Sequence, residues 1–259
     1  MACHSMRVCV VASKHLAIRQ NKIENVKHKV FFIPIVKMAY AISPIQSRYL
    51  NGVVDSPEPV TTPLPMTVYE NVIASLQAGP NPSIFVFDCD WTLYPYDCDK
   101  ERIGPFSWSP WNGVSDCYGR PSNSYIDVPS IFGAIIDTGI PVAFLSRNPS
   151  AAQVKQLLSV IPCITKVNQT KKCLLDAMPD DTYFHVYSSG GIGKGKDKHF
   201  SALKTASGIP FSEMLFFDDI LENIQAAQVQ RTTAVLLGKK GLIVEAFTDG
   251  LDSWRKSNI

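Results

Sequence analysis

Residues able to carry out chemistry stand directly behind the apolar runs of this 259-residue sequence. Four of these runs are followed within a few positions by acidic, hydroxyl, amide or basic side chains. In chain order these side chains are Asp88, Asp90 and Thr92, then Ser146, Arg147 and Asn148, then Lys194 and Lys196, and finally Asp218, Asp219 and Asn223. Carboxylate oxygens are ligands that Mg²⁺ prefers, and serine, lysine and arginine side chains bind anionic groups. The residue types therefore suit a site for an anion together with a hard divalent cation.

The apolar runs themselves predict strands of a parallel sheet. The runs at 84–87, 141–145, 183–187, 214–217 and 233–237 are short and mainly apolar, as in strands that are buried on both faces. Helical stretches follow at 129–138, 149–160, 197–207, 220–228 and 242–254, and a capping box at Thr67 predicts a first helix to about residue 78. This alternation predicts a doubly wound, Rossmann-like α/β fold with a parallel five-stranded sheet. Ligands bind at the carboxyl ends of such strands, so the four groups of polar residues should converge.

The chain divides into an extension and a folded domain. Residues 51–66 are rich in proline and threonine, which predicts a linker. Residues 1–66 therefore form an N-terminal extension for which we predict no ordered fold. Residues 67–259 form the α/β domain. Residues 93–127 interrupt the alternation with proline, glycine, serine and aromatic residues, without helical periodicity. We expect a small insertion of loops with a β-hairpin there, rather than a separate cap domain.

Composition and charge limit the classes of partner and the cellular compartment that we expect. The net charge is +2, so no bulk attraction to nucleic acid is expected. The most apolar stretch, 30–42, is too short to span a bilayer, so no membrane is expected. The seven cysteines form no C-x-x-C pair, which favours a reducing compartment and therefore the cytoplasm. Residues 1–50 carry eight basic residues and one acidic residue, which leaves a mitochondrial leader as the alternative.

The four groups of polar residues resemble, in order, the four motifs of the haloacid dehalogenase (HAD) superfamily. Asp88-Cys89-Asp90-Trp91-Thr92-Leu93 resembles the first motif, Ser146 the second, Lys196 (or else Lys194) the third, and Asp218-Asp219 with Asn223 the fourth. Within that superfamily, the chain resembles the magnesium-dependent phosphatase-1 family, whose members are acid phosphatase-like. Three phrases carry this resemblance: Phe87 to Pro95, Lys196 to Phe200, and Gly208 to Asp219. Most of the superfamily has glycine where Trp91 stands, whereas this family tolerates an aromatic residue there.

The resemblance implies a Mg²⁺-dependent phosphatase with assigned residues. Asp88 would be the nucleophile that forms an aspartyl-phosphate, and Asp90 the general acid and base. Mg²⁺ would be held by Asp88, by the Asp90 backbone carbonyl and by Asp218, with Asp219 and Asn223 in support. Ser146 and Lys196 would bind the phosphoryl group. Arg147 is a candidate for the same role, with a surface charge as the alternative. The substrate would be a phosphorylated small molecule or a phosphoprotein, such as a phosphosugar adduct or protein phosphotyrosine, and we expect a monomer.

Two alternatives share these motifs. A catalytically silent phosphate-binding scaffold would retain the fold, but such proteins usually lose one of the acids, and both Asp88 and Asp90 are present. A HAD phosphotransferase usually carries a lid domain that excludes water, for which the insertion at 93–127 is too small. A cysteine-based phosphatase is excluded because none of the seven cysteines has an arginine six positions later.

Overall fold

The predicted sheet is present in the structure, a computed structural model that describes residues 64–166, 172–188 and 195–258. Within these ranges, five strands pair in parallel in the order β7-β4-β1-β8-β9. Their bounds are Ile84–Phe87 for β1, Val142–Ser146 for β4, Phe184–Val186 for β7, Met214–Asp218 for β8 and Thr233–Leu236 for β9. The chain proceeds from the central β1 outward to β7 and then returns to the other side of β1 for β8 and β9. This is the doubly wound arrangement, which confirms the predicted fold class.

The central strand separates two hydrophobic cores, which explains why its sequence is apolar throughout. All four residues of β1 are completely buried. Phe85 and Phe87 belong to one core, whereas Ile84 and Val86 belong to the other. Successive side chains of a strand point to opposite faces, so a sheet covered on both sides needs apolar residues at every position.

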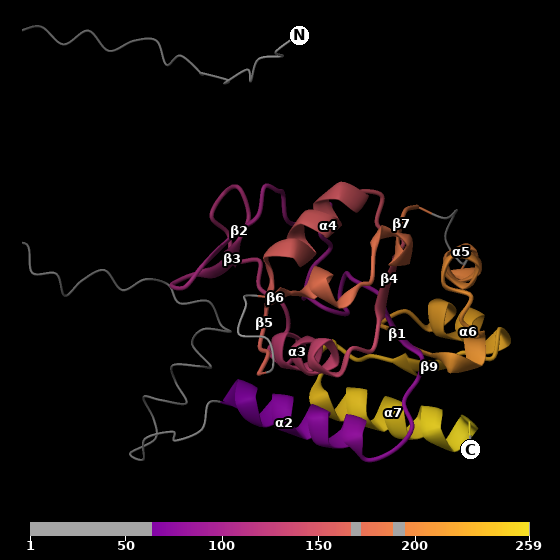
Figure 1. Cartoon of the computed structure of the whole chain (residues 1–259). Coiled ribbons are helices and arrows are strands. Elements are labelled where there is room, and N and C mark those ends of the chain that lie inside the picture. Colours follow the sequence, from indigo (N-terminus) through magenta and orange to yellow (C-terminus); the bar gives the residue numbers. More distant parts are fainter. Residues whose placement is uncertain (1–63, 167–171, 189–194, 259) are drawn as a thin grey trace, which may run out of the picture. The chain divides into compact units, whose positions relative to one another are not determined.

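Helices cover both faces of the sheet. The first core includes residues of α2 (Leu64–Gln77), α3 (Val128–Thr138), α4 (Ala151–Val160) and α7 (Val244–Asn258). The second core includes residues of α5 (Asp197–Ser207) and α6 (Leu221–Val229). Figure 1 shows α2 and α7 side by side along the bottom of the view, with α5 and α6 together at its right. The charged and polar residues at the strand ends are therefore carried on a frame that is packed from both sides.

Several predicted boundaries differ from the structure by one to four residues, and three of these corrections have a clear physical reason. Helix α2 begins at Leu64, so residues 64–66 belong to the helix and not, as their composition predicted, to the linker. The helix tolerates Pro65 because the first turn needs no backbone N–H. Strand β4 begins at Val142, because Pro141 has no N–H to donate to the ladder. The predictions for residues 1–63 fall outside the described residues.

The third correction concerns the start of α4. The helix begins at Ala151 and not at Pro149. The side-chain oxygen of Asn148 accepts a hydrogen bond from the backbone N–H of Ser150 at 2.8 Å. This local turn competes with a helical start and delays the helix by two residues. Ser150 is the residue that precedes the helix.

The insertion at 93–127 consists of loops and one short hairpin among the described residues, as predicted. Strands β2 (Ser107–Ser109) and β3 (Gly113–Ser115) pair antiparallel. Gly113 has φ +66°, and an added Cβ would lie 2.2 Å from the side-chain oxygen of Asn123, so the hairpin needs glycine there.

Several short elements complete the domain. A second antiparallel pair, β5 (Pro162–Cys163) with β6 (Lys172–Cys173), was not predicted, because two-residue strands leave no periodic pattern. The remaining elements are the 3₁₀ turns η2 (Leu174–Ala177), η3 (Asp181–Tyr183) and η4 (Phe211–Glu213). No helix in the described part of the chain has the length and apolar character needed to span a membrane.

Candidate active site

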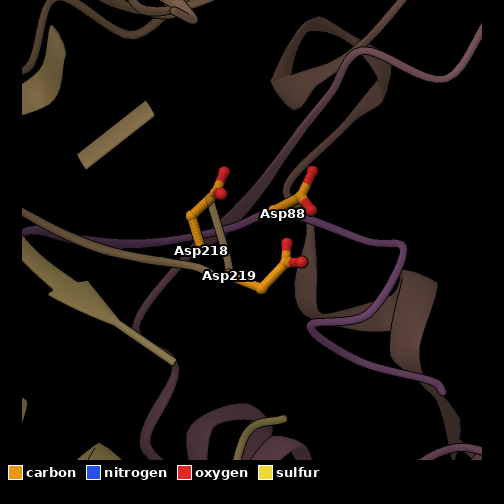
Figure 2. A group of neighbouring side chains, drawn as sticks. All are labelled: Asp88, Asp218 and Asp219. Atoms are coloured by element: carbon orange, nitrogen blue, oxygen red, sulfur yellow. The ribbon is translucent and has the colours of Figure 1, made fainter. Parts of the chain in front are cut away.

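Three carboxylates meet where β1 and β8 end. Asp88 directly follows β1, Asp218 is the last residue of β8, and Asp219 comes next. Their ligand oxygens lie within 4.8 Å of one another, and Figure 2 shows the three side chains grouped at the strand ends. The backbone N–H of Asp88 donates to the carbonyl of Phe217 at 3.0 Å, which continues the ladder to the edge of the sheet. The sheet itself therefore brings together what we name the strand-end cluster: Asp88, Asp218 and Asp219.

Lys196 enters this cluster from the N-terminus of α5. Its ammonium group pairs with Asp88 and with Asp218, the latter at 2.6 Å. The lysine is 1% exposed, and the two partners are 5% and 0% exposed. Burial alone would lower the pKa of Lys196, but the charges of Asp218 and Asp88 outweigh it and raise the pKa. The structure thus places Lys196 at the site, whereas Lys194 lies outside the described residues.

Positive charge is scarce in the strand-end cluster. Burial, together with the nearby charges of Asp218 and Asp90, raises the pKa of Asp88 well above its usual range, although Lys196 opposes the shift. Burial and the charge of Asp218 also raise the pKa of Asp219, to about 6. Oδ1 of Asp219 is buried and has no hydrogen-bond partner among the described residues. An oxygen-only set with an unsatisfied carboxylate oxygen fits a hard divalent cation.

Asn223 supports Asp218 from the first turn of α6. Its amide nitrogen donates to both carboxylate oxygens of Asp218, at 3.0 and 2.9 Å, and the backbone N–H of Ile220 donates to Oδ1 at 2.7 Å. Asn223 is 1% exposed. These donors fix the orientation of Asp218, so the predicted supporting residue acts through that carboxylate.

Asp90 belongs to a second group of acids. It lies with Asp97 and Asp99, whose ligand oxygens are also within 4.8 Å of one another and of Asp90; we name these three the insertion cluster. The backbone N–H of Cys98 donates to Oδ1 of Asp90 at 3.1 Å, and the Asn148 amide donates to Oδ2 at 2.7 Å. Burial raises the pKa of Asp90, and these two hydrogen bonds oppose the shift.

Ser146 and Arg147 lie at the end of β4, next to β1. Ser146 is 2% exposed, and its Oγ accepts a hydrogen bond from the backbone N–H of Asn148 at 3.2 Å, which leaves the hydroxyl hydrogen available to donate. Arg147 is half-buried. Nε2 of His199, three residues after Lys196, lies 3.0 Å from the carbonyl of Ser146 and 3.0 Å from that of Tyr187. His199 thereby fastens α5, which carries Lys196, to the end of β4.

These residues line one cleft with a volume of about 530 Å³. The predicted site residues in its lining are Asp88, Asp90, Ser146, Arg147, Lys196, Asp219 and Asn223. Asp218 lies beneath them, completely buried. The cleft therefore brings together predicted residues from all four groups, although Thr92 and Asp218 are completely buried and do not line it, and Lys194 falls outside the described residues.

The lining also includes residues to which the sequence analysis assigned no role. Asp97, Asp99 and Lys100 come from the insertion, and a stretch without periodicity carries no signal that would have placed them. Asn148 was noted after its strand, but its amide contact with Asp90 depends on how the insertion folds back. Trp91 has φ +57°, a left-handed conformation that favours glycine. This conformation gives the physical reason why glycine is common at that position in the resembled superfamily.

Known proteins match this chain over the same domain. A family model described as Acid Phosphatase matches residues 80–257. The chain is 28% identical over 176 residues to magnesium-dependent phosphatase 1 of Homo sapiens, an alignment that covers 68% of this chain and 89% of that protein. It is 27% identical over 168 residues to a HAD-like hydrolase superfamily protein of Schizosaccharomyces pombe, covering 64% of this chain and 92% of that protein. These matches confirm the resemblance drawn from the four motifs, and this chain belongs to the acid phosphatase family.

Proposed function

We propose that this chain is a Mg²⁺-dependent phosphatase that hydrolyses phosphate monoesters through an aspartyl-phosphate on Asp88. The observation that carries the proposal is the position of Asp88: it directly follows the central strand, lines the cleft, and shares the buried ammonium group of Lys196 with Asp218. A phosphate dianion repels nucleophiles, so its hydrolysis needs positive charge and a fixed attacking group in one place.

The cation proposal rests on the strand-end cluster. Asp88 and Asp218 would hold Mg²⁺ with their carboxylates and Asp90 with its backbone carbonyl, with Asp219 in support. The unpartnered Oδ1 of Asp219 supports this assignment. When bound, the ion would supply positive charge next to the phosphoryl oxygens.

The chain's own residues account for the proton and bond changes. A carboxylate oxygen of Asp88 attacks phosphorus, and the ester P–O bond breaks as Asp90 gives its proton to the leaving oxygen. Water then attacks the phosphorus of the aspartyl-phosphate, Asp90 takes the proton of that water, and the bond to Asp88 breaks to release inorganic phosphate. The Ser146 hydroxyl, Arg147 and Lys196 hold the phosphoryl oxygens during both steps.

A phosphatase fits the structure better than the two alternatives. A silent scaffold has no need for an acid held by two donors, as Asp90 is. A phosphotransferase must exclude water, whereas the insertion contributes a short hairpin and loops beside the cleft.

For the substrate we propose a phosphorylated small molecule or a phosphoprotein, with phosphosugar adducts and protein phosphotyrosine as the first classes to test. The cytoplasm remains the proposed compartment and a monomer the proposed state.

Activity of the purified full-length chain on 4-nitrophenyl phosphate tests the proposal. We expect nitrophenol release with Mg²⁺ and none after chelation. Asp90→Asn should slow the second step, so acid quenching followed by peptide mass analysis should find a phosphoryl group on the peptide that contains Asp88. A wild-type protein that is inactive with Mg²⁺ on this ester, on phosphopeptides and on phosphosugars would contradict the proposal.

A further inference from the structure

Asn148 connects two parts of the site that are far apart in the sequence. It lies between β4 and α4, is 4% exposed and lines the cleft. Its amide nitrogen donates to Oδ2 of Asp90 at 2.7 Å and to Oδ1 of Asp99 at 3.1 Å. Its amide oxygen accepts from the backbone N–H of Ser150 at 2.8 Å. One buried side chain thus contacts the proposed general acid, the insertion and the start of α4.

These contacts allow one orientation of the amide. A backbone N–H can only donate, so the atom facing Ser150 must be the oxygen. With the oxygen facing Ser150, the nitrogen faces Asp90 and Asp99, and one carboxyl oxygen of each accepts from it. A flipped amide would place its oxygen against two carboxylates and its nitrogen against an N–H group. The network therefore holds the N–H group that points at Asp90 in a defined direction.

The Asp90 carboxyl group is held by two donors from other parts of the chain. It stands two residues beyond the ladder position of Asp88, next to Trp91 in a left-handed conformation. Cys98 N–H holds one oxygen, and Asn148 holds the other. Without Asn148, the second oxygen would lose its donor, and the carboxyl group could rotate about its side-chain bonds.

From this geometry we propose, building on the phosphatase function proposed above, that Asn148 is a positioning residue that aligns the Asp90 carboxyl group for proton transfer to the leaving oxygen. The contact with Asp99 gives the amide its second acceptor and ties this alignment to the insertion. Asn148 acts through Asp90 and needs no contact with the phosphoryl group.

This role predicts a loss of activity that depends on the leaving group. A nitrophenolate is stable as an anion and departs with little help from an acid, whereas an alkoxide must be protonated as it leaves. The parameter kcat/KM reports the steps up to phosphoryl transfer to Asp88, where this difference arises. A residue that merely supports the fold would lower kcat/KM for both kinds of ester by the same factor.

The experiment compares Asn148→Ala with wild type on 4-nitrophenyl phosphate and on an alkyl phosphate such as glycerol phosphate. We expect a drop in kcat/KM of at least about tenfold on the alkyl ester and of no more than about threefold on the nitrophenyl ester, because general acid catalysis contributes about 10²–10⁴-fold in total. In an Asp90→Asn background, Asn148→Ala should have little further effect on the alkyl ester, since both changes remove the same proton transfer.

Gln156→Ala is the matched control. Gln156 also joins α4 to the insertion through its amide, with hydrogen bonds to the backbone N–H and carbonyl of Phe106 at 2.8 and 2.9 Å, but it does not contact Asp90. We expect Gln156→Ala to change kcat/KM by the same factor for both esters. A loss in Asn148→Ala that is equal for both esters, or a full additional loss in the Asp90→Asn background, would overturn the positioning role while leaving the phosphatase function intact.

A second variant, Asp99→Ala, tests the proposal if Asn148→Ala does not fold. Asp99→Ala keeps Asn148 and removes the acceptor that holds its second N–H, so it should show the same leaving-group dependence to a smaller degree. If Asn148→Ala does not fold and Asp99→Ala lowers both rates equally or not at all, the proposal fails. A wild-type protein without activity on either ester would instead overturn the proposed function.

Discussion

The strand-end cluster and the insertion cluster contain the same residue type but hold it in different ways. Asp88 and Asp218 are buried at the ends of paired strands and share a buried lysine. In the insertion cluster, Asp97 forms an ion pair with Lys100, a lysine whose side chain is 73% exposed. Asp90 and Asp99 share the Asn148 amide instead of a cation. Carboxylates held by rigid strands around a cation suit metal and phosphoryl binding, whereas an acid held by neutral donors suits proton transfer.

Position in the fold, rather than residue type, thus determines the proposed role of each carboxylate. The pKa of Asp219 is raised to about 6, chiefly by burial. The pKa of Asp99 is also raised to about 6, but chiefly by its hydrogen bond with Asp97. Similar pKa values thus arise from desolvation in one cluster and from a shared hydrogen bond in the other. Three experiments test whether the two clusters differ in this way.

The largest difference between the two clusters is expected in kcat. Asp88→Asn removes the proposed nucleophile and should lower kcat by more than about 10³-fold. Asp97→Asn in the insertion cluster should change kcat by no more than about threefold, because its ion-pair partner Lys100 is exposed and such pairs contribute little. Steady-state hydrolysis of 4-nitrophenyl phosphate with Mg²⁺ measures both variants. Comparable losses would show that the clusters do not divide the work as proposed.

The next largest contrast is expected in the contributions of Lys196 and Lys100 to the free energy of unfolding. Lys196→Met leaves Asp88 and Asp218 buried without their cation and should lower the free energy of unfolding by about 3–5 kcal/mol in the absence of Mg²⁺. Lys100→Met should cost no more than about 1 kcal/mol, since exposed pairs contribute little. Urea unfolding with a chelator present measures both. The proposed cation site also implies that Mg²⁺ restores part of the stability of Lys196→Met, and equal losses in the two variants would refute the contrast.

The smallest contrast concerns protons released on metal binding. Mg²⁺ binds the ionised carboxylate, so its affinity should fall as the pH drops through about 6, the pKa of Asp219. For one linked proton the loss approaches about tenfold per pH unit below that value. Calorimetric titration in two buffers with different ionisation enthalpies counts the protons released.

Variants assign the released proton to one cluster. Asp219→Asn should weaken Mg²⁺ binding by about 10–100-fold, as for residues that support a metal site, and should remove about one released proton near pH 6. The carboxyl group of Asp99 has a similar pKa, but Asp99→Asn should change neither the Mg²⁺ affinity nor the number of protons released. A proton that disappears with Asp99→Asn instead would place the metal in the insertion cluster.

Much of the fold could be predicted from the sequence because its signals are local. Strands buried on both faces must be apolar throughout, as β1 is, and the helices between them show their own periodicity. Boundaries were less accurate where a side chain competes with the backbone, as Asn148 does before α4. The hairpin β2–β3 was expected within the insertion, but a loop without periodicity does not reveal which of its residues return to the site.

The sequence by itself determined the chemistry that is available at the strand ends. Parallel strands place their carboxyl ends on one edge, so the alternation alone predicted that Asp88, Ser146 and Asp218 would converge. The tertiary structure decided which side chains touch: that Lys196 pairs with both Asp88 and Asp218, that Asn223 holds Asp218, and that Asn148 links Asp90 to the insertion. Such contacts join residues up to 108 positions apart. They depend on how loops pack against the finished sheet, and a local sequence pattern carries no record of that packing.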